Sequence, residues 1–151
     1  MFRIGGSFAG VLASAEVAGS LAARWPSHAI VRALSDSVDV VAIVMTPTWR
    51  ADVDELVGST VLMEGFELLS ASLIEMLTEH SHRGPVGYVE RTWGFEIVDC
   101  AACWEHGKIS AGPLGTAVTA DGSNSALNEV LGALGIDRYH HPAVLRALAD
   151  L

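Results

Sequence analysis

Apolar residues recur three or four positions apart in several segments of the chain, the spacing that lines one face of a helix. Pro26 closes the first of these segments, and Pro142 opens the last. We therefore expect helices, one of them only a short acidic turn, over residues 15–25, 50–57, 72–81, 125–134 and from Pro142 onward.

Polar residues at the ends of two of these segments predict where the helices start and stop. Ser72 and Glu75 fit a capping box at the start of the third helix. Ser125 is a suitable N-cap for the fourth helix, and Gly135 supplies the left-handed residue that ends it, with Ile136 as the apolar contact beyond.

Other segments have the composition or the two-residue alternation of strands. Val40–Met45 is an unbroken apolar run that predicts a buried strand, and Ser59–Met63 is a further possible strand. VGYVERTW predicts a strand at 86–93, and FEIVDCAACWE predicts another at 95–105. His106-Gly107 then forms a two-residue turn into KISAG, which makes a hairpin. The glycines and proline of Gly112–Ser123 indicate an exposed loop.

This order of segments predicts an α+β protein. We expect a single domain over residues 1–151, with a small, mostly antiparallel sheet and a central hairpin packed against three to four helices. A chain of 151 residues, half of them hydrophobic, can bury a core without metal or disulfides.

Charge narrows the choice of partner. The chain has 18 acidic and 9 basic residues, a net charge of −9. Nucleic acids and anionic membranes both require a basic surface, so neither is an expected partner. An acidic surface instead favours a basic protein partner. The high apolar content also leaves room for a homo-oligomer. We predict no cofactor.

The stretch DCAACWEHGK, residues 99–108, contains both cysteines at a C-x-x-C spacing. Zinc needs about four ligands, usually from two such pairs, and the chain has no second pair. In a strand, the side chains of Cys100 and Cys103 point to opposite faces, so the two thiols cannot share an ion or form a disulfide. The alternative is a metal or redox site, with the ligand set Cys100, Cys103, His106, His80 and His82.

The remaining histidines and the start of the chain carry weaker signals. His140 and His141 precede Pro142 at a helix start, and we expect them to be solvated. The first residues resemble a signal peptide, but Gly5, Gly6 and other small residues interrupt the apolar stretch. Two cysteines with no disulfide framework fit a reducing compartment, so we expect a cytoplasmic protein.

The segments FELLSASLIEML, RGPVGYVE, AACWEHGKISAGP and SALNEVLGALGI lie within residues 66–136. This series resembles a family of small uncharacterised actinobacterial proteins. In that family a G-P-x-x-Y-x-E strand, an F-G-G turn, an A-A-x-W strand and an A-L-x-x-L-G helix follow one another. Here Trp93-Gly94-Phe95 stands where the F-G-G turn falls. The resemblance implies a fold unit and a bacterial source, and it implies no chemistry.

The segment GSFAGVLASAEVAGSLA, residues 6–22, is similar to the opening of bacterial glycerate kinases, D-S-F-K-G-S-L-S-A-x-E-V-A. Gly6 and Ala9 replace the acidic residue and the lysine of that opening. In the later D-G-G segment, Ser37 and Val38 replace the two glycines that follow Asp36. The resemblance therefore implies a remnant that lacks the catalytic groups.

These observations favour a non-catalytic binding protein of the immunity or antitoxin kind that occludes a basic partner. Acidic residues would steer the partner's approach, and an apolar anchor would supply holding energy. The expected contact surface consists of Trp49, Asp52, Asp54, Glu55, Glu64 and Glu67. The alternatives are the metal or redox protein described above, and a subunit or adaptor of a larger bacterial assembly.

Overall fold

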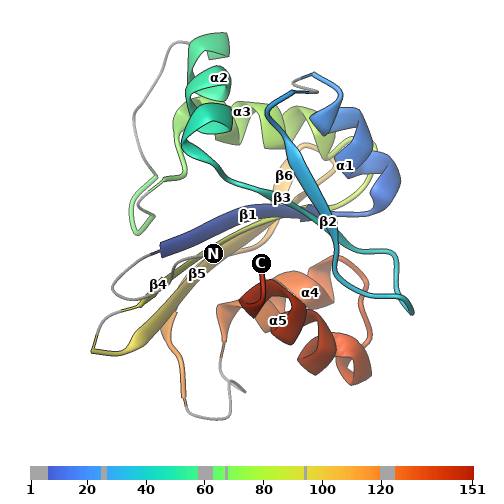
Figure 1. Cartoon of the computed structure of the whole chain (residues 1–151), viewed down its shortest axis with the longest axis vertical. Coiled ribbons are helices and arrows are strands. Elements are labelled where there is room, and N and C mark those ends of the chain that lie inside the picture. The colour runs from blue at the N-terminus through green and yellow to red at the C-terminus, as the bar shows by residue number, and fades with distance from the viewer. Residues whose placement is uncertain (1–6, 25–26, 58–62, 67, 94, 120–124) are drawn as a thin grey trace.

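One antiparallel sheet forms the centre of the molecule, in a computed structural model that describes residues 7–24, 27–57, 63–66, 68–93, 95–119 and 125–151 (Figure 1). The strands in this part of the chain are β1 Ser7–Ala13, β2 Ile30–Ala33, β3 Val41–Val44, β4 Val86–Trp93, β5 Ile97–Glu105 and β6 Lys108–Ala117. Their order across the sheet is β2-β3-β1-β4-β5-β6, and every neighbouring pair is antiparallel.

Helices cover both faces of this sheet. They are α1 Ala15–Ala22, α2 Pro47–Val57, α3 Ala71–His80, α4 Ala126–Ala133 and α5 His141–Ala149, with a 3-10 turn, η1, at Arg138–His140. Helices α1, α2 and α3 lie on one face, and α4 and α5 lie on the other (Figure 1). The predicted α+β class is confirmed. None of the helices in the described residues has the length and apolar character needed to cross a membrane.

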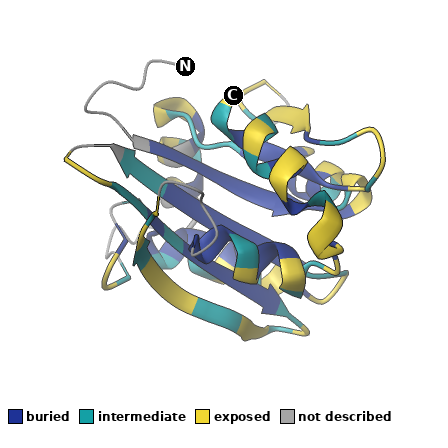
Figure 2. Ribbon diagram, turned by 90° about the horizontal axis from the view of Figure 1, so that it is seen from below, coloured by how far each residue is buried: buried dark blue, intermediate teal, exposed yellow. Residues whose placement is uncertain are grey.

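The two helical layers create two hydrophobic cores, one on each side of the sheet. In β5, Ala102 and Trp104 contribute to the core beneath α1–α3, whereas Ala101 and Cys103 contribute to the core beneath α4 and α5. Because both faces are covered, the inner strands bury residues on both sides, and β4 and β5 also carry the buried carboxylates of Glu90 and Asp99. Figure 2 shows these strands buried along most of their length, with exposed residues along the edges of the sheet.

The central strand was not expected from the sequence. Strand β1 lies between β3 and β4, with Gly10 opposite Val44 on one side and opposite Val89 on the other. Gly10 is suited to this place because a Cβ there would lie 3.1 Å from the carbonyl oxygen of Ile43. Strand β2, at the edge beside β3, was also not predicted.

The predicted cap of α3 and the predicted end of β6 were wrong. The cap of α3 is Ser70, whose Oγ accepts a hydrogen bond of 3.2 Å from Leu73 N; Ser72 is buried inside the helix. Residues 112–117, expected in a loop, continue β6, because Leu114 and Thr116 pair with β5. Shifts of register beside Cys103 accommodate the irregular part of this strand.

Several other predictions are confirmed. The hairpin turn falls at His106-Gly107, between β5 and β6. Ser125 Oγ caps α4 by accepting a hydrogen bond from Leu127 N at 3.1 Å, and Gly135 follows the helix with a φ of +83°. Residues 59–62 of the possible strand at 59–63 lie outside the described part of the chain, and Met63 is not in a strand.

Candidate functional site

The two cysteines lie on opposite faces of β5, as the strand alternation predicted. Cys100 packs against the core beneath α1–α3, and its Sγ donates a weak hydrogen bond to the carbonyl oxygen of Gly65 at 3.3 Å. Cys103 is fully buried in the opposite core, beneath α4 and α5. Both thiols are free, and a sheet separates them, so they cannot act together on an ion or a disulfide.

The environment of Cys103 also disfavours thiol chemistry. Burial raises the pKa of this thiol, and the negative charge of Glu105 acts in the same direction. Hydrogen bonds with Ser110 and with the backbone of Trp104 and Val86 oppose this rise in pKa without overcoming it. A thiol of raised pKa is protonated at neutral pH, and the protonated form is a poor nucleophile and metal ligand.

The histidines of the alternative metal set have separate structural roles. His80 is buried at the end of α3, with Nδ1 2.9 Å from the carbonyl oxygen of Met76. The ring of His82 lies against Gly107, where a Cβ would come within 2.7 Å of it. His106 is exposed, and its backbone N–H donates to the carbonyl oxygen of Ser81 at 3.0 Å. These contacts attach the β5–β6 turn to the end of α3. Among the described residues, no group of three or more metal-binding side chains converges.

The expectation that His141 is solvated was wrong. Its ring is buried beneath the end of α4, with Nε2 2.8 Å from the carbonyl oxygen of Ile136 and Nδ1 3.2 Å from Asn128 Oδ1. His140 is half-buried, and its ring meets that of Tyr139 edge-on at a centroid distance of 5.3 Å.

Trp49 cannot serve as the exposed anchor that the sequence suggested. Helix α2 begins at Pro47, earlier than expected, which places Trp49 and Val53 one turn apart on its inner face. Trp49 is 0% exposed and belongs to the core beneath α1–α3. It is a packing residue.

The acidic residues expected around Trp49 are accessible where the structure describes them. Glu55 and Glu64 are exposed, and Asp52 is partly exposed, with Oδ2 in contact with Nδ1 of His28. The side chain of Asp54 and the whole of Glu67 lie outside the described residues.

Further acidic side chains extend this surface over α1 and α3, which the sequence prediction missed. We call the resulting surface the acidic helical face; its described acidic members are Glu16, Asp52, Glu55, Glu64, Glu75 and Glu79. The described arginines of the same layer are Arg24 and Arg83. Arg24 lies 3.8 Å from Glu79, a long contact between partly exposed groups. The surplus charge of this layer is therefore negative.

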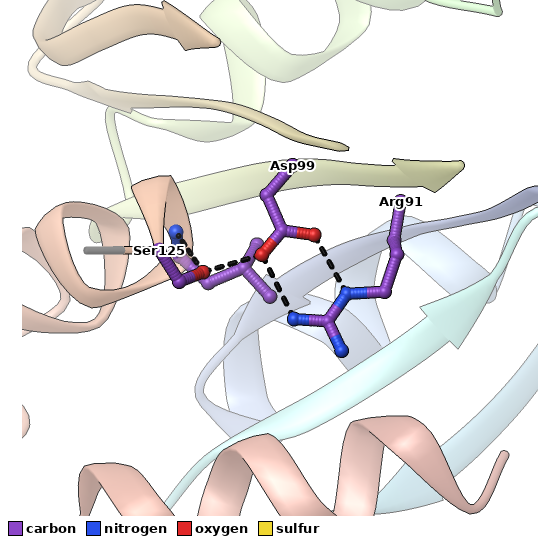
Figure 3. A network of polar contacts seen from close by, with 4 residues as sticks. Arg91, Asp99 and Ser125 are labelled. Atoms are coloured by element: carbon purple, nitrogen blue, oxygen red, sulfur yellow. Dashed lines mark hydrogen bonds and ion pairs between the residues drawn. The ribbon is translucent and has the colours of Figure 1, made fainter. Parts of the chain in front are cut away.

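A buried ionic network lies on the other side of the sheet, beneath α4. The guanidinium of Arg91 on β4 donates two hydrogen bonds, of 2.6 and 2.8 Å, to the carboxylate of Asp99 on β5. Ser125 Oγ donates to the same carboxylate at 2.5 Å, and Figure 3 shows Arg91 and Ser125 approaching Asp99 from two directions. Because Ser125 also caps α4, this network fixes the start of α4 on the sheet.

The network has a structural role. The gap beside it, lined by Arg91, Phe8, Leu127 and Leu148 among others, has a volume of about 10 Å³. That is about the smallest volume in which a single water molecule fits. The sequence contained one signal for the pair, because Arg91 and Asp99 are equidistant from Phe95 at the tip of the β4–β5 hairpin.

A second buried carboxylate lies on the face beneath α1–α3. Glu90 accepts hydrogen bonds from the hydroxyl of Tyr88 at 2.8 Å and from the backbone N–H of Leu68 at 2.9 Å. Leu68 precedes α3, so Glu90 holds the entry to that helix against the sheet. This group also contributes to the fold rather than to a reactive centre.

An open hollow lies at the connection between β2 and β3. It has a volume of about 380 Å³ and includes Asp36 and Asp39 among its lining residues. Asp39 Oδ1 accepts a hydrogen bond of 2.9 Å from the backbone N–H of Ala15, at the start of α1. Ser35 Oγ accepts from the backbone N–H groups of Ser37 and Val38 and so shapes the loop.

Comparison of the chain with protein-family models, with curated proteins and with solved structures finds no significant match. The resemblances to an actinobacterial family and to glycerate kinases therefore stay predictions from the sequence.

Proposed function

We propose that this protein is a non-catalytic binding protein of the immunity or antitoxin kind, which uses the acidic helical face to bind and occlude a basic protein. The observation that carries the proposal is the segregation of charge on α1–α3. Six described acidic side chains share this layer with two described arginines.

The arrangement of the helices supports this proposal. Helices α2 and α3 contact each other, and Glu55 and Glu75 are exposed on them. Asp52 contacts His28, which links α2 to the segment before β2. Such a field would accelerate the approach of a basic partner and would be screened by salt.

The buried carboxylates already have structural partners. Asp99 and Glu90 are both engaged in hydrogen bonds that hold helices on the sheet. The carboxylates available to a partner are therefore those on the outer surface.

The test uses two variants of equal charge on opposite sides of the molecule. Glu55→Lys combined with Glu75→Lys reverses charge on the acidic helical face. The matched control is Glu129→Lys combined with Asp150→Lys, because both residues are exposed on the opposite layer. Association rates are measured with the basic protein encoded beside this gene, at low and physiological ionic strength.

We expect the first variant to lower the association rate at least about tenfold at low salt, and the control to change it less than about twofold. Equal effects of the two variants would mean that only net charge matters, which would contradict a binding surface on α1–α3. Absence of a complex at low salt would remove the proposal.

A further inference from the structure

Strand β2 forms an open edge of the sheet. Each of its four residues is exposed, including Ile30 at 38% and Val31 at 39%. β-Branched apolar residues are favoured in strands, and an edge that exposes them is a template for a further strand.

The alternation of hydrogen-bonded pairs between β2 and β3 identifies the main-chain groups of β2 that point away from β3. The N–H of Leu34 donates to the carbonyl oxygen of Val40 at 3.1 Å, so Leu34 and Val40 form a hydrogen-bonded pair. Such pairs alternate along an antiparallel ladder, which makes Arg32 and Ala42 the next hydrogen-bonded pair. Val31 and Ala33 therefore direct their N–H and C=O groups away from β3, toward the open edge.

The opposite edge is much less suitable. Strand β6 contains Pro113, which has no N–H to donate, and its pairing with β5 shifts register on both sides of Cys103. Proline and bulges are common means by which proteins block an edge strand. Strand β2 contains neither feature among its four residues.

The charges at the end of β2 indicate which kind of strand it would accept. Asp36 and Asp39 line the hollow of about 380 Å³ that begins at Ala33, and Glu16 is exposed next to Ala15, another lining residue. Within the strand, Arg32 Nη1 donates to the outward carbonyl oxygen of Val31 at 3.2 Å, so an added strand would have to displace this contact to pair with Val31.

We propose that β2 binds an extended segment of the basic partner by strand addition. The segment would pair antiparallel with Val31 and Ala33 and would place its N-terminal basic side chains at Asp36. This inference rests on the proposed function and adds the site of main-chain contact. A second copy of this chain is a poorer occupant, because each copy carries a net charge of −9.

The probe is a fluorescent, terminally blocked peptide of two lysines followed by alternating valine and threonine, measured by anisotropy. Ala33→Pro removes an outward N–H, and proline is tolerated at such an edge position. Ala33→Val is the matched control that keeps the N–H. A second arm uses wild-type protein with the same peptide N-methylated throughout its valine–threonine segment, so the test does not depend on the folding of a variant.

We expect wild type and Ala33→Val to bind the peptide within about twofold of each other. Ala33→Pro, and wild type with the N-methylated peptide, should bind about tenfold more weakly. No binding to wild type, or unchanged binding of the N-methylated peptide, would overturn the inference. So would a wild-type dimer that Ala33→Pro dissociates, because the edge would then belong to a second copy.

The two proposals can fail separately. If the Glu55/Glu75 variant loses the basic partner while the N-methylated peptide binds wild type as well as its parent does, the acidic helical face stands and strand addition is wrong. If N-methylation weakens binding while charge reversal on α2 and α3 has no effect on the partner, strand addition stands without the acidic helical face.

Discussion

Arg91 binds Asp99 through two hydrogen bonds across the β4–β5 hairpin, and the carboxylate of Asp99 is 0% exposed. The Arg91 side chain is only 18% exposed, so each charge depends on the other for compensation. Ser125, the N-cap of α4, donates a hydrogen bond to the carboxylate of this pair. Loss of this pair should therefore also weaken the attachment of α4 to the sheet.

Asp99→Asn keeps the shape of the side chain and removes its charge. Because the guanidinium would then be largely buried without a counter-ion, we expect a loss of about 3 kcal/mol in the free energy of unfolding, measured with urea. The control is Glu79→Gln in the exposed contact with Arg24, which should cost less than about 0.5 kcal/mol. Similar losses for both variants would contradict the role assigned to Asp99.

Trp49→Ala should destabilise the protein by about 3–5 kcal/mol, because it removes a fully buried indole from the core beneath α2. Trp49→Phe should cost less, since it keeps most of the apolar volume. Calorimetry of both variants measures the effect. A Trp49→Ala protein of wild-type stability that no longer binds the basic partner would instead restore Trp49 as a contact residue.

Alanine substitutions at two glycines should change the free energy of unfolding in opposite directions. A Cβ on Gly87 would lie 2.4 Å from Val130 Cγ1, so Gly87→Ala should push α4 away from the sheet and cost about 1–3 kcal/mol. Gly132 lies within α4, where an added Cβ would meet no described atom within 4 Å apart from the neighbouring backbone of its own helix, and Gly132→Ala should stabilise by about 0.5–1 kcal/mol. Urea unfolding distinguishes the two signs, and a stabilising Gly87→Ala would mean that α4 packs less closely than described.

The two thiols should react at very different rates with an aromatic disulfide reagent. Cys100 is partly exposed and should be labelled in the native protein, whereas Cys103 should react only when the protein unfolds. The variant Cys103→Ala should therefore retain the fast phase, and Cys100→Ala should lose it. Rapid labelling of both cysteines in the native state would show that the core beneath α4 and α5 opens readily.

Alkaline pH should destabilise the protein partly through Cys103. Burial raises the pKa of this thiol in the folded state, so the folded protein holds the proton more tightly than the unfolded chain. The resulting stability is present below the unfolded pKa, about 8.5, and is lost as pH rises above it. Urea unfolding between about pH 8 and 10 should give a shallower decline for Cys103→Ala than for wild type. Parallel declines would contradict this assignment.

The sequence predicted those elements whose signals are local. The β4 and β5 strands, the His106-Gly107 turn and the Ser125 cap all depend on residues a few positions apart. The division of the two cysteines between the faces of β5 followed from the same two-residue period.

Elements that depend on distant neighbours were missed or misplaced. Strand β1 has a glycine, Gly10, where β3 passes close to it, and the small residues of this segment hid the strand from the sequence pattern. The sequence predicted Trp49 and His141 at the surface. Their burial depends on how α2 packs and on contacts at the end of α4, which local sequence patterns do not reveal. For the candidate surface, the acidic character of α2 could be predicted, but its continuation over α1 and α3 needed the tertiary structure.

The position of β1 has a consequence for how the chain folds. Its partners are β3 on one side and β4 on the other, and the register pairs Ser7 with Thr92. Strand β1 can therefore acquire its second neighbour only after the chain has been synthesised as far as β4. Pairing between strands so far apart in the sequence is typical of topologies that fold more slowly, and β1 exposes an unpaired edge until β4 joins it.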